Sequence, residues 1–274
     1  MKKQTLGFIG AGNMASSLIG GLISDGYPAE NILVSDVDTA KLRDLATRFS
    51  VHTFEDNKSV VERSQTVLLA VKPQILEQVA REIAAAVQQA GPLIISIAAG
   101  VREAALDHWL GGDASIVRCM PNTPALVKTG ATALHANDRA SPDHKSVAEA
   151  IVRAVGIAVW VEREELLDLV TALSGSGPAY FFLFMEAMED AATEMGLDKA
   201  TARLLTQQTA LGAARIAIES EDGPAELRRR VTSPGGTTEK AIEIFERGSF
   251  RSLVRDAMRA ANARAAELSK QLGG

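Results

Sequence analysis

The chain of 274 residues contains little cysteine, histidine or aromatic side chain, and it has no excess of basic residues. Its single cysteine, Cys119, excludes an internal disulfide, which agrees with a reducing compartment. No histidine lies near Cys119 in the sequence, so we expect a small buried hydrophobic residue rather than a nucleophile. The formal net charge of -5 gives no reason to expect a nucleic-acid partner, because such proteins concentrate Lys and Arg on one face.

Signals for export or membrane insertion are also missing from the pattern. After Met1 the chain runs into a short apolar strand and glycines, without the apolar core and cleavage site of a secretory signal. No apolar stretch approaches the roughly 20 residues that span a bilayer. The hydrophobic share of 46% with 23% charged residues is ordinary for a soluble protein, so we expect a cytoplasmic location and no membrane contact.

The two halves of the chain differ in periodicity. In the first half, short β-rich runs alternate with amphipathic stretches, which is typical of βαβ units and a mainly parallel sheet. Residues 163–270 contain no convincing strand and read as successive helices. We therefore predict an α/β domain over residues 1–162 and an all-helical domain over residues 163–274. The expected strands are Thr5–Ile9, Asn31–Ser35, Thr66–Val71, Leu93–Ile97, Ser115–Cys119, Ala131–His135 and Ile157–Val161.

The segment Pro178–Met195 is apolar on more than one side, with aromatic residues at Tyr180, Phe181, Phe182 and Phe184. A helix of this kind must be covered on several sides. In a small helical domain another subunit provides such cover, so the segment predicts an oligomer interface. A central core helix fits the same pattern equally well.

A glycine motif, Gly10–Ala15, follows the first expected strand and opens a helix. Its glycines permit a tight turn and close approach of the backbone to a pyrophosphate, while the helix N-terminus supplies free N–H groups and a partial positive charge. A second strand then ends at Ser35, so the motif predicts a dinucleotide site. The residues expected to contact the dinucleotide here are Gly10, Gly12, Asn13, Met14 and Ser35.

Asp36 bears on the choice between NADH and NADPH. A carboxylate at this position can accept from the ribose 2′-OH of NADH and repels the 2′-phosphate of NADPH. A solvated turn residue, with an N-cap role for its neighbour Asp38, is the alternative interpretation. Lys41 and Arg43 on the next helix leave NADPH open. The expected cofactor is therefore NADPH or NADH, with Asp36 favouring NADH.

Further strand ends should border the same crevice, because ligands collect at the carboxyl ends of strands in a doubly wound sheet. One strand ends in the four residues Ala70, Val71, Lys72 and Pro73, which places Lys72 toward the crevice. However, a lysine at the end of a strand is also commonly exposed to solvent and has no ligand.

The ends of the next two strands are expected to lie near the nicotinamide ring of the cofactor or near the substrate. The small residues around Ala98 would let a nicotinamide ring lie close to the backbone. In the loop Met120–Pro124, two prolines restrict the backbone, and Asn122 offers its amide to the cofactor or the substrate.

A loop in the helical half, Val231–Thr238, precedes the amphipathic run Glu239–Phe245. Its two glycines and the emerging helix can present several N–H groups to one point, which suits an anion such as a carboxylate. A plain interhelical turn explains one cap residue but not the whole run. In the run Ser174–Pro178, Pro178 in the first turn of the next helix and Ser176 as its cap are sufficient structural reasons for most of the motif. We therefore interpret this run first as a hinge and subunit contact, and second as a site.

Together these motifs resemble the pyrroline-5-carboxylate reductase family. The resemblance covers nearly the whole chain in the family's order, and the second-half motifs are specific to the family. It implies an N-terminal Rossmann domain and a C-terminal helical dimerisation domain interlocked with that of a second subunit, often in a pentamer of dimers, a decamer. The motifs that carry it are Gly10–Ala15, Ala70–Pro73, Arg118–Pro124, Ser174–Tyr180 and Val231–Thr238.

The resemblance also implies a substrate site between the nicotinamide of one chain and the Ser233–Thr238 loop of the same or a partner chain. Backbone N–H groups of Gly235, Gly236 and Thr237 would hold the substrate carboxylate with help from the Ser233 hydroxyl, and Thr238 would hydrogen-bond the ring nitrogen. No metal is implied. By the same match, Asn57 and Lys72 belong to the cofactor side, and Glu221 and Val231 to the substrate side.

The expected reaction is hydride transfer from NAD(P)H to the C=N carbon of 1-pyrroline-5-carboxylate, the last step of proline biosynthesis. A protonated imine is already a strong electrophile, so alignment is the main requirement, and no His-carboxylate or Lys pair is needed. Thr238, directly or through a water, would keep the proton on nitrogen.

Two other functions fit parts of the pattern. A β-hydroxyacid dehydrogenase shares the two-domain plan, but it needs a lysine on the helix Ala179–Glu186, where this chain has none. A dinucleotide-sensing protein would bind NADH and leave the Ser233–Thr238 loop empty.

Overall fold

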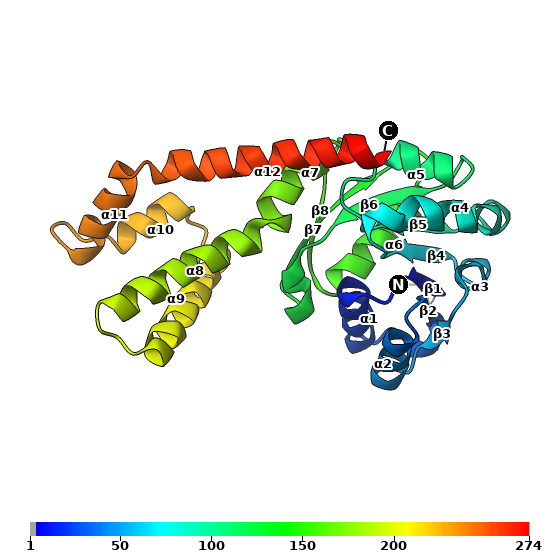
Figure 1. Cartoon of the computed structure of the whole chain (residues 1–274), viewed down its shortest axis with the longest axis horizontal. Coiled ribbons are helices and arrows are strands. Elements are labelled where there is room, and N and C mark those ends of the chain that lie inside the picture. Colours follow the sequence, from blue (N-terminus) through cyan, green and yellow to red (C-terminus); the bar gives the residue numbers. More distant parts are fainter. Residues whose placement is uncertain (1–3, 274) are drawn as a thin grey trace. The chain divides into compact units, whose positions relative to one another are not determined.

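The computed structural model describes residues 4–273. The chain forms two compact units (Figure 1): the first contains the residues up to Ser176 and those from Ala261 on, and the second is Gly177–Ala260. The domain boundary predicted between residues 162 and 163 stays a prediction, since these units are defined by compactness alone.

The first unit is built on one sheet with the strand order β3-β2-β1-β4-β5-β6-β7-β8. Every neighbouring pair is parallel except β6 and β7, which confirms the mainly parallel Rossmann-type sheet. The chain runs outward from β1 to β3 and then returns to β4 on the other side of β1, so the topological switch point lies between β1 and β4. The strands are β1 (Leu6–Ile9), β2 (Ile32–Ser35), β3 (His52–Phe54), β4 (Thr66–Leu69), β5 (Leu93–Ser96), β6 (Ile116–Met120), β7 (Gly130–Ala136) and β8 (Gly156–Trp160).

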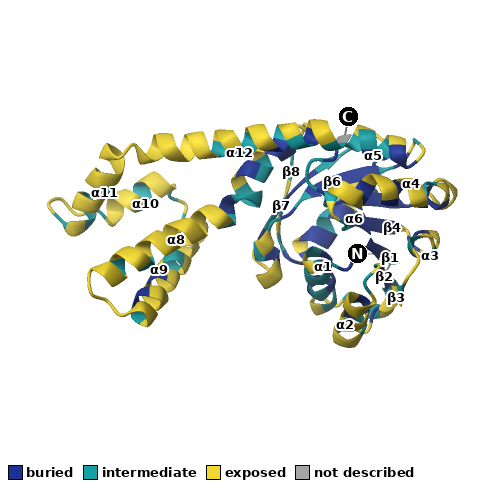
Figure 2. Ribbon diagram, in the orientation of Figure 1, coloured by how far each residue is buried: buried dark blue, intermediate teal, exposed yellow. Residues whose placement is uncertain are grey.

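Helices cover both faces of this sheet, which is why its central strands are buried along their whole length (Figure 2). Side chains alternate between the faces: Leu6 and Phe8 pack into one core, and Ile9 packs into the other. On the first face lie α1 (Asn13–Ser24), α2 (Thr39–Phe49) and α6 (Pro142–Arg153), and on the second lie α3 (Asn57–Glu62), α4 (Pro73–Ala90) and α5 (Glu103–Trp109).

Two features of this unit bear on the sequence predictions. The seven expected strands are present with ends shifted by one or two residues, but β3 was missed, because it is a three-residue edge strand in which His52 and Thr53 are exposed. Cys119 is fully buried on β6, and burial raises the pKa of its thiol to about 12. The thiol is therefore protonated at neutral pH, which confirms a buried hydrophobic residue rather than a nucleophile.

The second unit has almost no core of its own. Among its described residues only Gly177, Ala202 and Thr206 are buried, and Figure 2 shows its helices as mostly exposed. Phe181 is 68% exposed, so the central-core-helix alternative for this segment is wrong. The helices are α8 (Gly177–Glu194), α9 (Lys199–Glu219), α10 (Pro224–Arg230), α11 (Thr237–Arg247) and α12 (Phe250–Gly273), whose residues from Ala261 on belong to the first unit.

The expectation that no apolar stretch approaches membrane-spanning length is wrong for one helical run. Leu166–Glu194 joins α7 (Leu166–Val170), a π-helical turn (Thr171–Gly175) and α8 into 29 residues whose best window has a mean hydropathy of 1.3. Length and composition alone would let this run cross a bilayer. We missed it because its apolar residues are interrupted by glycine, serine and proline at Ser174–Pro178.

A buried ion pair joins distant parts of the first unit. Asp168 on α7 accepts a hydrogen bond from Arg102 Nη2 at 2.5 Å and another from Ser269 Oγ on α12 at 3.0 Å. The side chain of Asp168 is only 9% exposed. The carboxylate therefore ties the end of the loop after β5 to α7 and to the last helix.

A second ion pair involves Glu164, which lies shortly before Asp168 in the sequence. Arg118 on β6 is buried and its Nη1 contacts Glu164 Oε1 at 2.5 Å. The same Glu164 oxygen accepts the backbone N–H of Glu103 at 2.7 Å. Burial, and then the nearby Glu164 carboxylate, raise the pKa of Glu103. The N-terminus of α5 is thus held by carboxylates from the segment after β8.

Replacing Asp168 with Ala should lower the free energy of unfolding by about 2–4 kcal/mol, because it leaves the partly buried Arg102 without its counter-charge. Urea denaturation at fixed protein concentration measures this change. Asp44→Ala is the matched control, because its pair with Arg48 is exposed on α2 and should contribute less than about 1 kcal/mol. Equal effects of the two substitutions would contradict the structural role of Asp168.

Candidate functional site

The glycine motif lies at the switch point of the sheet. Gly10 has a φ of 103°, and a Cβ there would lie 2.7 Å from the carbonyl oxygen of Ala70, so only glycine fits between β1 and β4. Gly12 is the N-cap of α1, no side chain caps it, and a Cβ on it would meet nothing within 4 Å. The N-terminus of α1 therefore opens onto free space with unpaired N–H groups, which fits a pyrophosphate.

The residues after Gly12 divide between surface and core. Asn13 is exposed in the first turn of α1, and its carbonyl oxygen accepts from Ser17. Met14 is half-buried and packs against the core on the α1 face. Of these two predicted residues, only Asn13 presents its side chain to solvent at the helix start.

Asp36 braces the glycine loop. Its Oδ2 accepts the backbone N–H of Ala11 at 2.7 Å, and its Oδ1 accepts the backbone N–H of Asp38 at 2.8 Å. The carboxylate thus connects the turn after β1 with the turn after β2, and both of its oxygens have a backbone partner. The alternative of a merely solvated turn residue is wrong for this side chain, whereas the N-cap role of Asp38 is confirmed, because its carboxylate accepts the N–H groups of Ala40 and Lys41 at the start of α2.

Ser35 and Asn57 meet beside this turn. Ser35 is buried, and its hydroxyl donates to Asn57 Oδ1 at 2.8 Å. The Asn57 amide nitrogen in turn donates to Glu82 on α4 at 3.3 Å. The two predicted cofactor residues therefore form one chain of hydrogen bonds along the ends of β2 and α3.

The end of β4 continues the same edge of the sheet. Ala70 donates its N–H to Ile9 at 2.8 Å, Val71 packs against the core under α4, and Pro73 occupies the first turn of α4. Lys72 is the exposed N-cap of α4 and follows β4, the strand that pairs with β1. These residues share the edge that holds Gly10, as predicted for a doubly wound sheet.

The loops after β5 and β6 are held from within the protein. Ala98 is buried, and its N–H donates to Ser96 Oγ at 3.4 Å. The amide of Asn122 has two backbone partners: its Nδ2 donates to the carbonyl of Ser174 at 3.0 Å, and its Oδ1 accepts from the N–H of Ala131 at 2.9 Å. Asn122 therefore fixes the π-helical turn before α8, a contact that sequence reasoning did not foresee.

The predicted substrate loop is a glycine-led helix start. Gly235 has a φ of 73°, and Gly236 is the N-cap of α11 with no side-chain cap. The N–H of Gly236 donates to the carbonyl of Ser233 at 3.0 Å, whereas the N–H groups of Thr237 and Thr238 stand in the first helical turn, where no helical partner exists. The open donors are thus at Thr237 and Thr238 rather than at Gly236.

The hydroxyls around this loop are available to a ligand. Within the described residues, Ser233, Thr237 and Thr238 make no side-chain hydrogen bond to the rest of the chain. Val231 and Glu221 are exposed, at the end of α10 and in the turn between α9 and α10. No group of three or more His, Cys, Asp or Glu side chains among the described residues is arranged to hold a metal ion.

Glu239 is a participant that the sequence analysis missed. Its Oε2 accepts the backbone N–H of Gly235 at 2.8 Å, from the third position of α11. A carboxylate three residues after a cap is a known signature of a helix start. Here the cap is glycine rather than serine or threonine, so the pattern was not recognised.

Comparisons with known proteins match both halves of the chain. Residues 164–268 match a family model described as pyrroline-5-carboxylate reductase dimerisation, and residues 5–100 match one described as NADP oxidoreductase, coenzyme F420-dependent. A pyrroline-5-carboxylate reductase of Pseudomonas aeruginosa is 50% identical over 273 residues, which cover 100% of both chains. The chain belongs to the pyrroline-5-carboxylate reductase family.

Solved structures of pyrroline-5-carboxylate reductases match along nearly the whole chain. The enzyme from Coxiella burnetii has a TM-score of 0.94 at 46% identity, covering 98% of this chain and 99% of its own. A Plasmodium falciparum pyrroline carboxylate reductase with NADP bound has a TM-score of 0.86 at 28% identity, with the same coverage. The predicted family, fold, NAD(P)H-dependent reductase activity and self-association through the helical half are thereby confirmed, and neither alternative function is supported.

For this member of the pyrroline-5-carboxylate reductase family, replacing Asp36 with Asn should weaken binding of both NADH and NADPH, each by about tenfold. An amide has one acceptor oxygen, so either Ala11 or Asp38 loses its partner and the glycine loop loosens. Fluorescence titration of each coenzyme measures the two dissociation constants. Asp44→Asn, which removes a charge from the exposed side of α2, is the control. Tighter binding of NADPH alone would show that Asp36 acts by repelling the 2′-phosphate instead.

Proposed function

We propose that the loop Ser233–Thr238 binds 1-pyrroline-5-carboxylate while the domain of residues 1–162 binds NAD(P)H. The observation that carries the substrate half is the start of α11, where open N–H groups and three free hydroxyls surround a helix end with a glycine cap. A carboxylate is the substrate group that such a helix end favours. The proposed cofactor contacts are Gly10, Gly12, Asn13, Met14, Ser35, Asp36, Asn57, Ala70, Val71, Lys72, Pro73, Ala98 and Asn122.

In this proposal the chain's own residues orient the substrate and maintain one proton. The N–H groups of Thr237 and Thr238, with the Ser233 hydroxyl, hold the carboxylate, and Glu221 and Val231 border the same site. The Thr238 hydroxyl hydrogen-bonds the ring nitrogen and keeps a proton on it, so the C=N carbon stays electrophilic. NAD(P)H, when bound, supplies the hydride to that carbon. Alignment of this kind accounts for a large part of the rate of such a reaction without a strong acid or base.

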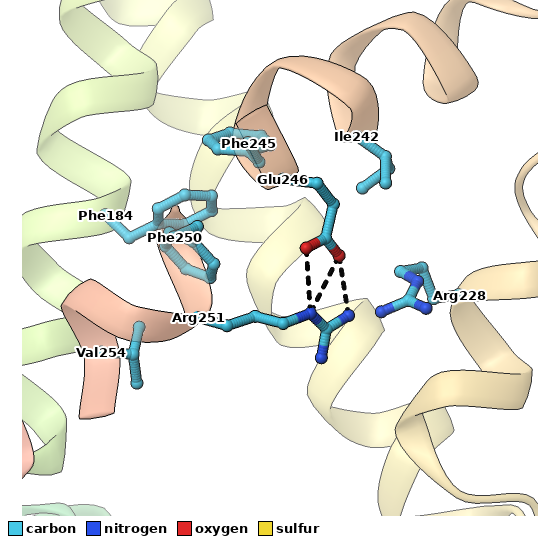
Figure 3. A pocket seen from close by; sticks show the side chains of 8 residues that line it. All are labelled: Phe184, Arg228, Ile242, Phe245, Glu246, Phe250, Arg251 and Val254. Atoms are coloured by element: carbon cyan, nitrogen blue, oxygen red, sulfur yellow. Dashed lines mark hydrogen bonds and ion pairs between the residues drawn. The ribbon is translucent and has the colours of Figure 1, made fainter. Parts of the chain in front are cut away.

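We further propose that the exposed helices of the second unit are covered by a second copy of the chain, and that five such dimers form a cytoplasmic decamer. The model matched by residues 164–268 supports dimerisation. A pocket of about 490 Å³ in this unit has an apolar wall of Phe184, Phe245 and Phe250 (Figure 3), whose rings lie 5.6–6.4 Å apart. Arg251 and Glu246 form an ion pair at its edge, at 2.8 Å.

A polar rim around an aromatic centre is typical of protein interfaces. The exposed apolar residues of α12, Leu253 and Val254, are flanked by Arg251 and Arg255, and charged groups at that spacing do not suit a lipid environment. A partner helix satisfies both kinds of group, which supports protein rather than lipid as the cover for these helices.

Replacing Thr238 with Ala should lower kcat/KM for 1-pyrroline-5-carboxylate by roughly 10- to 1000-fold, because a hydrogen bond to the reacting nitrogen is lost. The rate is followed as oxidation of NADPH and of NADH in the presence of the substrate. Thr238→Ser keeps a hydroxyl at the same position and should retain most of the activity. Unchanged kinetics in the alanine variant would remove Thr238 from the mechanism.

Replacing Phe182 with Glu should dissociate the assembly, raising the dimer dissociation constant by about 100-fold or more, because a charge would be buried without a partner. Phe182 is 63% exposed in the single chain. Light scattering coupled to size-exclusion chromatography gives the mass of each variant. Ile75→Glu, an exposed apolar position on α4, is the matched control and should leave the mass unchanged. An assembly that survives the Phe182 change would place the interface elsewhere.

A further inference from the structure

The substrate loop already holds a carboxylate that belongs to the protein. Glu239 Oε2 lies 2.8 Å from the backbone nitrogen of Gly235 and accepts its N–H. Gly235 carries the left-handed φ of 73° that turns this N–H toward the start of α11. The side chain therefore occupies one of the three N–H donors that the family resemblance assigns to the carboxylate of the substrate.

A single N–H group donates to one strong acceptor at a time. A substrate carboxylate that bonds to Gly235 must displace Glu239. A substrate that uses only the open N–H groups of Thr237 and Thr238 must still approach a helix start where Glu239, in the same turn, already supplies a negative charge. In either arrangement the two carboxylates compete for the same positive end of α11.

Intramolecular attachment makes Glu239 an effective competitor. Because it is part of α11, its local concentration at Gly235 is far higher than that of a free ligand. Its contact is partly exposed, so it exchanges with solvent and does not close the site permanently. The carboxyl groups farther along the same helix have partners elsewhere, since Glu243 pairs with Lys240 at 3.2 Å.

We propose that Glu239 is an internal carboxylate that competes with the substrate's carboxylate at the start of α11 and so sets the KM for 1-pyrroline-5-carboxylate. This inference rests on the proposed function of the Ser233–Thr238 loop. It makes Glu239 a specificity-determining residue: it weakens binding of every ligand that carries a carboxylate and leaves ligands without one unaffected. If Glu239 were only a structural cap, its removal would loosen the loop and raise the KM for 1-pyrroline-5-carboxylate instead of lowering it.

The test compares Glu239→Gln and Glu239→Ala with Glu243→Gln, which removes the same charge one turn farther along α11. KM is measured with 1-pyrroline-5-carboxylate and with 1-pyrroline, the same ring without a carboxylate, at saturating NADPH. We expect KM for 1-pyrroline-5-carboxylate to fall by about three- to tenfold in both Glu239 variants, with little change in kcat. KM for 1-pyrroline, and both constants in the Glu243 variant, should stay within about twofold of the parent chain.

Each other outcome has a distinct meaning. A KM for 1-pyrroline-5-carboxylate that is unchanged or raised in both Glu239 variants overturns the competition and leaves the proposed function standing. An equal fall for both substrates, or in the Glu243 variant as well, also overturns it, because the effect would then be general to the helix. A parent chain that oxidises neither NADPH nor NADH with 1-pyrroline-5-carboxylate refutes the proposed function itself. Thermal unfolding of each variant shows whether it is folded at the assay temperature.

Discussion

The N–H groups in the first turn of a helix have no partner inside that helix, and both proposed ligand sites of this chain depend on this constraint. α1 and α11 each start at a glycine, Gly12 and Gly236, without a side-chain cap. Some helices without a proposed ligand at their start have a side-chain cap: α2 and α9 are capped by the carboxylates of Asp38 and Asp198. Others, α5 and α10, start without one. The N–H group of Lys41 is the main cause that lowers the pKa of Asp38, so that cap is charged at neutral pH. Where the chain leaves a helix start uncapped, an anion from outside can replace the cap.

Several residues proposed for the ligand sites already have hydrogen-bond partners within the fold. Asp36 supports the turn proposed to receive the pyrophosphate, and Asn122 holds the π-helical turn before α8. Glu239 occupies an N–H group at the other site. A motif residue can thus be needed for a ligand while its own side chain bonds only to the protein. Changes at such positions alter binding through the shape of the loop, and their effects do not identify direct contacts.

The distribution of buried residues links folding to assembly. The first unit has two complete apolar cores, one on each face of its sheet, whereas the second has three buried residues in its described part. A set of helices with so little core gains its stability from a partner, so the free energy of unfolding of this part depends on protein concentration. The buried Asp168, which contacts Arg102 and Ser269, anchors the end of α12 to the first unit. Residues on α7 and α12 thereby help to fix the loop that follows β5.

Local patterns in the sequence were enough for the parallel sheet, the glycine turn and the helical second half. These depend on periodicity and on backbone conformations that short motifs dictate, as at Gly10, where no larger residue fits. Only the tertiary structure decided that Phe181 is exposed, that Asp168 meets a serine 101 positions away, and that β3 pairs at the edge. It also revealed Glu239 at Gly235, because glycine at the cap position hides the usual signature. The physical reason is that contacts between distant segments follow from the path of the whole chain, which no short stretch of residues specifies.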